Sequence, residues 1–242
     1  MKKNLVMKRL CYLLAACVLA MGLTACNNEK NSDYPTHVAM VTAEIIPYTK
    51  PASAAVSDYL STYYILFDTG KTGFPSETYV PAYQPKERQR ILIAYRMLEK
   101  APEGYDYGLR IYDIEEVLTK EVIQMTAENA EEIGDDPIDI VDAWVSGGYC
   151  NIRFRFVTNG SERHLLNLVD NLLTPDNNPE AGYTDLWFRQ NAFGDTQGYL
   201  VQGYVSFKLG AYNPSETGAK GIRIHYTDLS GREQILRRDA QE

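Results

Sequence analysis

The second half of the chain is a series of short segments in which apolar and polar residues alternate. Residues 150–157 show this most clearly, with Ile152, Phe154 and Phe156 on one face and arginines on the other. Successive side chains of a strand point to opposite faces, so this spacing predicts a strand with one buried side. About seven such segments follow Pro137 within roughly 100 residues, which is typical of an antiparallel β-sandwich.

Glycine-containing turns separate these segments. Gly147-Gly148 precedes the strand at 150–157, and Asn159-Gly160 follows it. Both residues of an Asn-Gly pair tolerate positive φ, so the pair is a strong hairpin signal. We therefore expect the chain to reverse at both places.

The first half of the chain also favours β-structure. Its strand candidates are rich in β-branched and aromatic residues and lie at 38–46, 60–67, 77–80, 91–98 and 107–112. Two short helices are expected between the halves, one capped by Asp113 and one over residues 126–133 that ends at Gly134. Asp135-Asp136-Pro137 is the expected boundary, so we predict an all-β chain with domains at 38–134 and 135–242.

The N-terminus has the pattern of an export signal. Basic residues at positions 2, 3, 8 and 9 precede an uncharged apolar run from Leu10 to Leu23. The run is short for a membrane-spanning helix, which needs about 20 apolar residues. It ends in Leu23-Thr24-Ala25-Cys26, which resembles the lipobox of bacterial lipoproteins. The resemblance implies removal of residues 1–25 and lipid attachment to Cys26, with residues 26–37 as a flexible tether.

Charge narrows the choice of partners. Cleavage before Cys26 would remove four of the 24 Lys and Arg residues and none of the 32 Asp and Glu residues. The net charge then changes from −8 to −12, which disfavours nucleic acid and an anionic membrane surface as partners. Asn27 stands where an aspartate would resemble an inner-membrane retention signal, which favours the outer membrane.

Apart from the lipidated Cys26, the mature chain contains one cysteine, Cys150. Cys11 and Cys17 lie in the signal, so Cys150 has no partner for an intrachain disulfide. A cysteine in a strand candidate is more commonly a buried apolar residue than a nucleophile. We therefore expect Cys150 to be a buried thiol.

Four segments, taken together and in order, carry a family resemblance. They are 66–72 (LFDTGKT), 89–95 (QRILIAY), 105–120 with its Tyr-Asp-Tyr start and its Val-Leu-Thr-Lys end, and 136–144 (DPIDIVDAW). They resemble the NigD-like lipoproteins of anaerobic Gram-negative bacteria. The resemblance implies an N-terminal OB-like barrel over 38–134 and a C-terminal β-sandwich over 135–242. It implies no catalytic or ligand-binding residues, and the family name implies a role in bacteriocin immunity.

Asp68-Thr69-Gly70 resembles the catalytic triplet of aspartic proteases. That chemistry needs two aspartates that share a proton. The chain has one such triplet. The residue after it is Lys71, whereas the motif that it resembles has Ser, Thr or Ala at this position. We therefore expect these residues to form a turn between two strands.

The remaining motifs predict no metal site. Residues 176–182 place oxygen atoms at alternate positions, but the glycine falls one place late for an EF-hand and no bidentate glutamate ends the loop. His37, His164 and His225 lack metal-ligand spacing, and we expect His225 to be exposed on the same strand face as Arg223. The sequence thus predicts no metal, no cofactor and no enzyme activity.

Aromatic residues leave two interpretations open. Ten of the 18 tyrosines lie between residues 38 and 128. They either form the edges of a barrel core, since tyrosine favours strands, or face a protein or sugar ligand. Trp144 and Trp187 are expected to pack between the sheets of the second domain.

The sequence therefore favours a non-enzymatic envelope lipoprotein that binds a protein or another envelope component. The alternative is a carbohydrate-binding lipoprotein at the cell surface, which would carry exposed aromatic residues on one concave face. The sequence does not indicate which residues contact the ligand.

Overall fold

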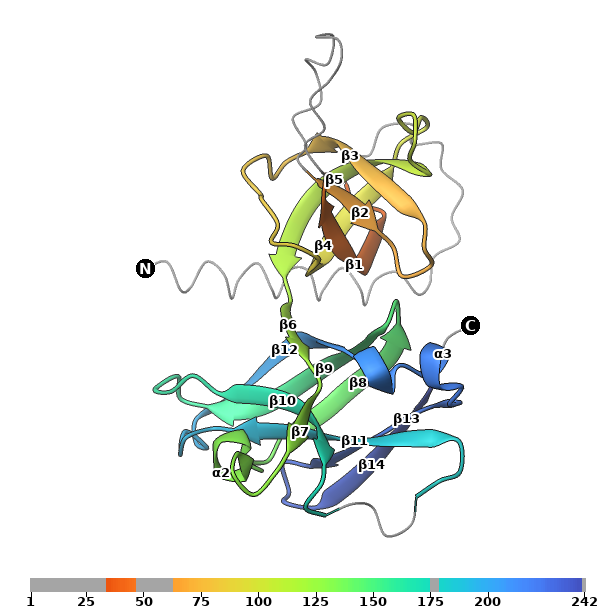
Figure 1. Ribbon diagram of the computed structural model, residues 1–242. Helices are drawn as coiled ribbons and strands as arrows, with labels where there is room; N and C mark the ends of the chain where they lie inside the picture. Colours follow the sequence, from red (N-terminus) through yellow and green to blue (C-terminus); the bar gives the residue numbers. More distant parts are fainter. Residues whose placement is uncertain (1–33, 47–62, 175–178, 241–242) are drawn as a thin grey trace, which may run out of the picture. The chain divides into compact units, whose positions relative to one another are not determined.

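The computed structural model describes residues 34–46, 63–174 and 179–240, and these are mostly in strands (Figure 1). From Pro35 on, they belong to one unit that contains a closed barrel and two further sheets. The expected all-β fold is confirmed. Cys26 lies outside the described residues. No helix in the described ranges is long and apolar enough to cross a membrane.

The barrel contains the five strands of the first half. They are β1 (His37–Ile45), β2 (Tyr63–Leu66), β3 (Thr72–Thr78), β4 (Gln89–Met97) and β5 (Tyr107–Glu116). The strands close in the order β1-β2-β3-β5-β4, with β3 parallel to β5 and the other pairs antiparallel. Branched aliphatic side chains fill the interior, among them Val41, Ile65, Ile91, Ile93 and Ile111. These residues favour strands and also pack well across them, so one composition serves both roles.

Two sheets form the second domain. The first has the order β14 (Glu233–Asp239), β13 (Gly221–Thr227), β11 (Tyr183–Asn191), β10 (Leu165–Asn171) and β7 (Ile123–Met125). The second has the order β6 (Leu118–Glu121), β12 (Tyr199–Lys208), β9 (Tyr149–Thr158) and β8 (Asp139–Ser146). The short helices η1 (Gly210–Tyr212) and α3 (Pro214–Thr217) connect β12 to β13.

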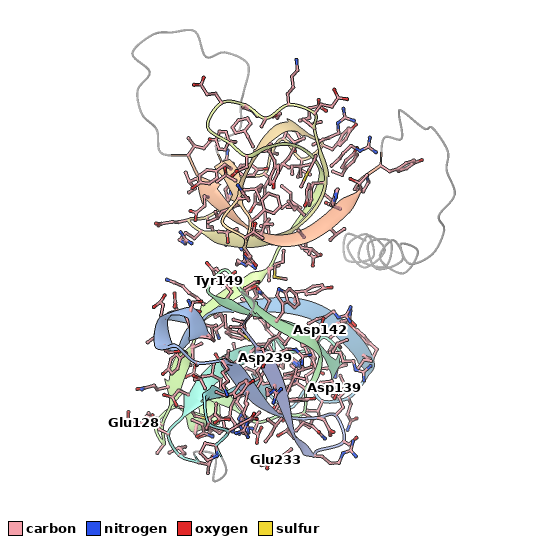
Figure 2. All side chains as sticks on the ribbon, turned by 90° about the vertical axis from the view of Figure 1, so that its right-hand side faces the viewer. Glu128, Asp139, Asp142, Tyr149, Glu233 and Asp239 are labelled. Atoms are coloured by element: carbon pink, nitrogen blue, oxygen red, sulfur yellow. The ribbon has the colours of Figure 1, made fainter. Side chains whose placement is uncertain are left out.

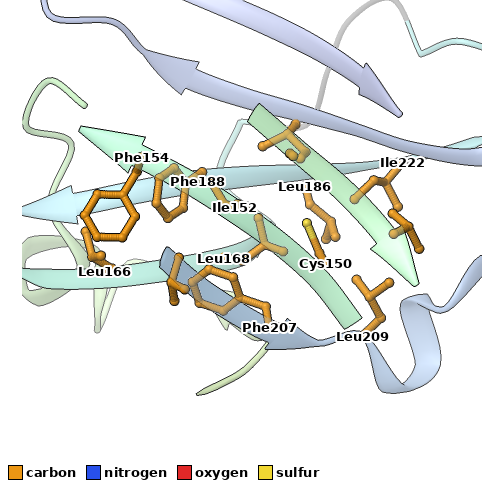
Figure 3. Packing of buried hydrophobic residues seen from close by; sticks show 14 of the residues in the cluster. Cys150, Ile152, Phe154, Leu166, Leu168, Leu186, Phe188, Phe207, Leu209 and Ile222 are labelled. Atoms are coloured by element: carbon orange, nitrogen blue, oxygen red, sulfur yellow. The ribbon is translucent and has the colours of Figure 1, made fainter. Parts of the chain in front are cut away.

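One apolar core fills the space between the two sheets (Figure 3). The alternation predicted for β9 is confirmed, because Ile152 and Phe154 are buried in this core and Phe156 packs against it. Gly147 and Gly148 form the turn before β9, both with positive φ. Gly160 also has a positive φ, of 82°, in the loop that joins β9 to β10. The sequence pattern therefore identified the buried face of β9 and the turn at Gly147-Gly148. The hairpin expected at Asn159-Gly160 is wrong, because β9 and β10 lie in different sheets and the loop crosses from one to the other.

The segment between the domains takes part in both sheets of the sandwich. β6 pairs in parallel with β12, and β7 pairs in parallel with β10. The change from barrel to sandwich therefore falls at Val117, between β5 and β6, and not at the expected Asp135-Asp136-Pro137. Those residues lie between α2 (Ala130–Ile133) and β8, inside the second domain.

The helix expected after Asp113 is wrong, because residues 113–116 belong to β5. Ile114 pairs with Ile93 of β4 and packs against the barrel core. This long-range pairing overrides the local capping signal, which is a weak preference by comparison. The second expected helix is confirmed in a shorter form as α2, and Gly134 follows it.

Candidate functional site

The outer face of the five-stranded sheet carries a groove of about 260 Å³. The lining residues are Trp187, Arg189, His225, Tyr226, Thr227, Glu233, Gln234 and Ile235. Strand register places Trp187 of β11 beside His225 of β13, and His225 beside Ile235 of β14. Ile222 and Ile224 of β13 point into the core, so the alternate residue His225 points outward.

Asp185 of β11 contacts His225, which lines the groove. Its Oδ1 lies 2.7 Å from His225 Nε2 and 3.4 Å from Arg223 Nε. The His225 ring stacks on the indole of Trp187, with ring centroids 4.5 Å apart and an angle of 17° between the planes. The expected exposure of His225 is therefore wrong, since its side chain is only 13% exposed. The strand face was predicted correctly, but the carboxylate and the indole cover the ring.

Asp135 contacts two other residues that line the groove, Arg189 and Thr227. Arg189 of β11 donates a hydrogen bond from Nη1 to Asp135 Oδ1. The same carboxylate oxygen accepts a hydrogen bond of 3.0 Å from Thr227 Oγ1. The positive charges of Arg189 and Arg223 are thus each paired with a carboxylate of this chain.

Glu233 and Ile235 form the exposed border of the groove on the edge strand β14. The Ile235 side chain is 53% exposed, and Glu233 lies at the protein surface (Figure 2). Among the charged residues that line the groove within the described ranges, Glu233 is the one whose side chain forms no ion pair or hydrogen bond. The groove thus combines one apolar border residue with one carboxylate that is available to a ligand.

A second polar cluster lies where the barrel meets the sandwich, and Arg90 of β4 is its centre. The Arg90 side chain is completely buried. Its Nη1 donates to Asp68 Oδ1 at 2.6 Å and to Thr42 Oγ1 at 3.1 Å. Its Nη2 donates to Asp68 Oδ2 at 3.0 Å and to Asn151 Oδ1 at 3.1 Å. Two parallel bonds to one carboxylate make this a geometrically specific ion pair.

The sandwich completes this cluster from β8, β9 and β12. Ser146 Oγ donates to Asp68 Oδ2 at 2.6 Å, and Ser206 Oγ donates to Asn151 Oδ1 at 2.7 Å. The Arg90 guanidinium also lies 4.6 Å from the ring centroid of Tyr149, which is labelled in Figure 2. Gly147 allows the β8–β9 turn to approach Asp68 closely, since a Cβ at this position would lie only 2.7 Å from Asp68 Oδ1. The ion pair lies within the barrel, and its hydrogen bonds to Ser146 and Asn151 link the two domains.

This cluster explains the protease-like motif. Asp68-Thr69-Gly70 forms the turn between β2 and β3, as predicted, with Gly70 N donating to Phe67 O. The Asp68 carboxylate faces Arg90 and Ser146 rather than a second aspartate. It therefore lacks the paired carboxyl groups that aspartic protease chemistry needs.

Cys150 is a buried thiol, as predicted. It is fully buried between the sheets beside Ile152 and Leu186 (Figure 3). Burial raises the pKa of the Cys150 thiol to about 12, because the thiolate would lose its hydration. A thiol with so high a pKa is a poor nucleophile at neutral pH.

The two tryptophans lie elsewhere than expected. Trp187 lies on the outer face of its sheet and packs with Met125, Ile133 and Val169 in a small cluster under α2. Trp144 lies between the core residues Ala143 and Val145 of β8, so its side chain also points away from the space between the sheets. The expectation of packing between the sheets is therefore wrong for both.

Four of the eight tyrosines described between residues 63 and 112 contribute to the barrel core. Tyr63 and Tyr95 are buried inside it, and Tyr83 and Tyr107 pack against it. Tyr79 differs, since its side chain is 58% exposed. These positions favour the core interpretation over a tyrosine-lined binding face.

The described residues contain no group of three or more His, Cys, Asp or Glu side chains that could hold a metal ion. His37 stacks on Tyr95 in the barrel, whereas His164 stacks on Phe156 in the sandwich. Part of the candidate calcium loop, residues 175–178, lies outside the described ranges.

The groove residues were missed by the sequence analysis, although a signal was present. Polar residues recur at every second position of β13, at 223, 225 and 227. In β11, Asp185 and Arg189 share one strand face with Trp187 between them. Local alternation places Arg223 and His225 on one strand face but does not pair that face with β11. Parallel pairing of β11 with β13 joins the two rows, and the sequence alone does not reveal such pairing.

Two domain families match the chain in order. The NigD-like N-terminal OB domain matches residues 56–117, and the NigD-like C-terminal beta sandwich domain matches residues 121–237. No curated protein matches the chain.

Several solved structures of bacterial proteins are similar to this chain. A protein of unknown function from Bacteroides vulgatus is 30% identical, with 85% of this chain and 90% of that chain covered and a TM-score of 0.70. A NigD-like immunity protein from Bacteroides caccae is 21% identical, with 85% and 94% covered and a TM-score of 0.58. A candidate lipoprotein from Bacteroides fragilis is 10% identical, with 85% and 98% covered and a TM-score of 0.53. At these identities the last two show the shared fold alone.

Proposed function

The chain belongs to the NigD-like family, and from this premise we propose that it is a lipid-anchored envelope protein that binds a protein partner. The observation that carries the proposal is the groove over β11, β13 and β14, with its exposed Ile235 and its available Glu233 carboxylate. Exposed apolar residues bordered by polar ones are common in protein interfaces. In this proposal the chain acts by binding and not by catalysis.

The anchor is the lipid on Cys26 that the N-terminal sequence indicates. The similarity in fold to a candidate lipoprotein supports it. We expect Cys26→Ala to release the protein from the membrane fraction, and unchanged membrane association would contradict the anchor. Protease treatment of intact cells then gives the orientation, because digestion of the wild type indicates the cell surface. Protection until the outer membrane is opened indicates the periplasm.

A protein ligand fits the groove better than a sugar. Sugar recognition commonly uses the open face of an aromatic ring, but Trp187 is only 8% exposed and His225 stacks on it. The groove therefore offers edges, an aliphatic side chain and charges rather than a flat aromatic platform. Carbohydrate binding remains the competing hypothesis, and a glycan array with the purified protein tests it.

Site-specific photo-crosslinking in living cells tests partner binding. A photoreactive amino acid at Ile235 should give a discrete adduct, because this exposed side chain borders the groove. The matched control places the same amino acid at Leu200, which is also 53% exposed but lies on β12 in the other sheet. Equal adducts at both positions, or none at Ile235, would contradict binding through the groove.

Bacteriocin immunity is one form that partner binding could take, in which the partner is a toxin. The family name and the immunity protein of similar fold support it. Expression of the wild-type chain in a sensitive strain should then give protection, and Cys26→Ala should abolish it. Full sensitivity of the strain that expresses the wild type would reject this role.

A further inference from the structure

The charges of the groove differ in whether they are already neutralised. Arg189 is paired with Asp135, and Asp185 is paired with both Arg223 and His225. Glu233 has no such partner within the described ranges. A ligand that enters the groove therefore meets one uncompensated negative charge, and the cations that would attract an anion are occupied.

The volume of the groove limits the size of the ligand. At about 260 Å³ it lies below the range of roughly 300–1,000 Å³ that is usual for small-molecule and cofactor pockets. A single long side chain is a better match. Interfaces commonly place one aromatic or arginine side chain in such a pocket, where it contributes much of the affinity.

We propose that this groove binds an arginine side chain from a basic segment of the protein partner, with Glu233 as its counter-ion. The inference rests on the proposed function and adds the chemistry of the ligand. The aliphatic stem of the arginine packs on Ile235 and the edge of Trp187, and the guanidinium reaches the Glu233 carboxylate. Arginine suits this geometry better than lysine because its flat guanidinium can bind the Glu233 carboxylate with two parallel hydrogen bonds.

The charge of the whole chain supports a basic partner. The full sequence has a net charge of −8. An acidic protein attracts basic partners over distances beyond direct contact, and this steering raises the rate of association at low salt. Binding should therefore weaken as the salt concentration rises.

The NMR signal of the Trp187 indole N–H reports on the groove directly. The chain has only two tryptophans, so Trp144→Phe identifies the Trp187 signal. The probe is the peptide acetyl-Gly-Arg-Gly-amide, added to the protein produced without residues 1–26. A matched peptide carries citrulline in place of arginine, which keeps the shape and removes the charge. Free N-acetylglucosamine serves as the sugar probe.

We expect a saturable shift of the Trp187 signal with the arginine peptide and a dissociation constant on the order of 1 mM. Glu233→Gln should weaken binding about three- to fivefold, which is the size of a partly exposed ion pair. The control Glu162→Gln, an exposed carboxylate in the β9–β10 loop, should leave binding unchanged.

Three outcomes would overturn the arginine assignment: no shift with the arginine peptide, equal binding of the citrulline peptide, or equal binding to Glu233→Gln. A shift with the sugar alone would also overturn it and favour the carbohydrate hypothesis. If the assignment fails while the crosslink at Ile235 persists, partner binding stands and only the ligand chemistry is wrong. If the crosslink also fails, the proposed function fails with it.

Discussion

Removal of the negative charge from the Arg90 cluster should destabilise the protein strongly. Asp68→Asn keeps the shape of the side chain but leaves the fully buried Arg90 guanidinium without a counter-ion. Two unit charges about 4 Å apart interact by roughly 4 kcal/mol at an effective dielectric constant near 20. Loss of one partner of a buried pair typically costs about 3–5 kcal/mol. Because Asp68 is 17% exposed, we expect the lower end, about 3 kcal/mol.

A second substitution separates the buried charge from other effects. In Asp68→Asn combined with Arg90→Met, the uncompensated charge is gone and an apolar side chain occupies a similar volume. We expect the double variant to be about 1–2 kcal/mol more stable than Asp68→Asn alone. The control is Glu121→Gln, which removes an exposed ion pair with Lys208 and should change stability by less than about 0.5 kcal/mol.

Denaturant unfolding followed by two probes is the assay. Both tryptophans lie in the sandwich, so fluorescence follows that domain alone, whereas circular dichroism follows the strands of both domains. In the wild type the two transitions should coincide, because the cluster couples the domains. In Asp68→Asn they should separate. A cost below about 1 kcal/mol, or a double variant less stable than Asp68→Asn, would refute the reasoning.

Three further predictions concern the sandwich. Phe207→Ala, at a fully buried core position, should lower the free energy of unfolding by about 3–5 kcal/mol in denaturant titrations. The Cys150 thiol, with its pKa raised by burial to about 12, should resist a thiol reagent at pH 8 in the folded protein and react fully in guanidinium. A fast native reaction would contradict that burial. Asp195 accepts hydrogen bonds from the Asn159 N–H and the Thr158 hydroxyl, which hold its pKa well below the usual range. Its contribution to stability is therefore present above about pH 4 and is lost as the pH falls further. Asp195→Asn should melt at a lower temperature than the wild type at pH 7, and this difference should shrink at pH 3.

The sequence predicted the strands well and their long-range pairing poorly. The alternation in β9 and the apolar runs of β1 and β4 depend on local periodicity, which a single segment shows. The assignment of β6 and β7 to the sandwich depends on partners far along the chain, so the boundary was placed too late. The capping signal at Asp113 also led to a wrong prediction, because pairing with β4 determines that residues 113–116 form a strand.

The candidate site could not be predicted from the sequence for a related reason. His225 and Trp187 are 38 positions apart, and only the parallel register of β11 and β13 makes them neighbours. Arg90 gave a clearer signal, since it is a charged residue next to the apolar run Ile91 to Ile93. Such a residue is either at the surface or paired in the interior, and the sequence did not show that Asp68 is its partner.

The parallel pairing of β6 and β7 has a consequence for the order in which the domains fold as the chain emerges from the N-terminus onward. Leu118 pairs with Val205, and Ile123 pairs with Val169, so both strands must wait for segments that emerge much later. The barrel strands, in contrast, have all their partners once residue 116 has emerged. The barrel can therefore assemble while the sandwich is still incomplete, since contacts that are distant in sequence form slowly. The connection between the domains is thus one of the last parts of the chain to become ordered.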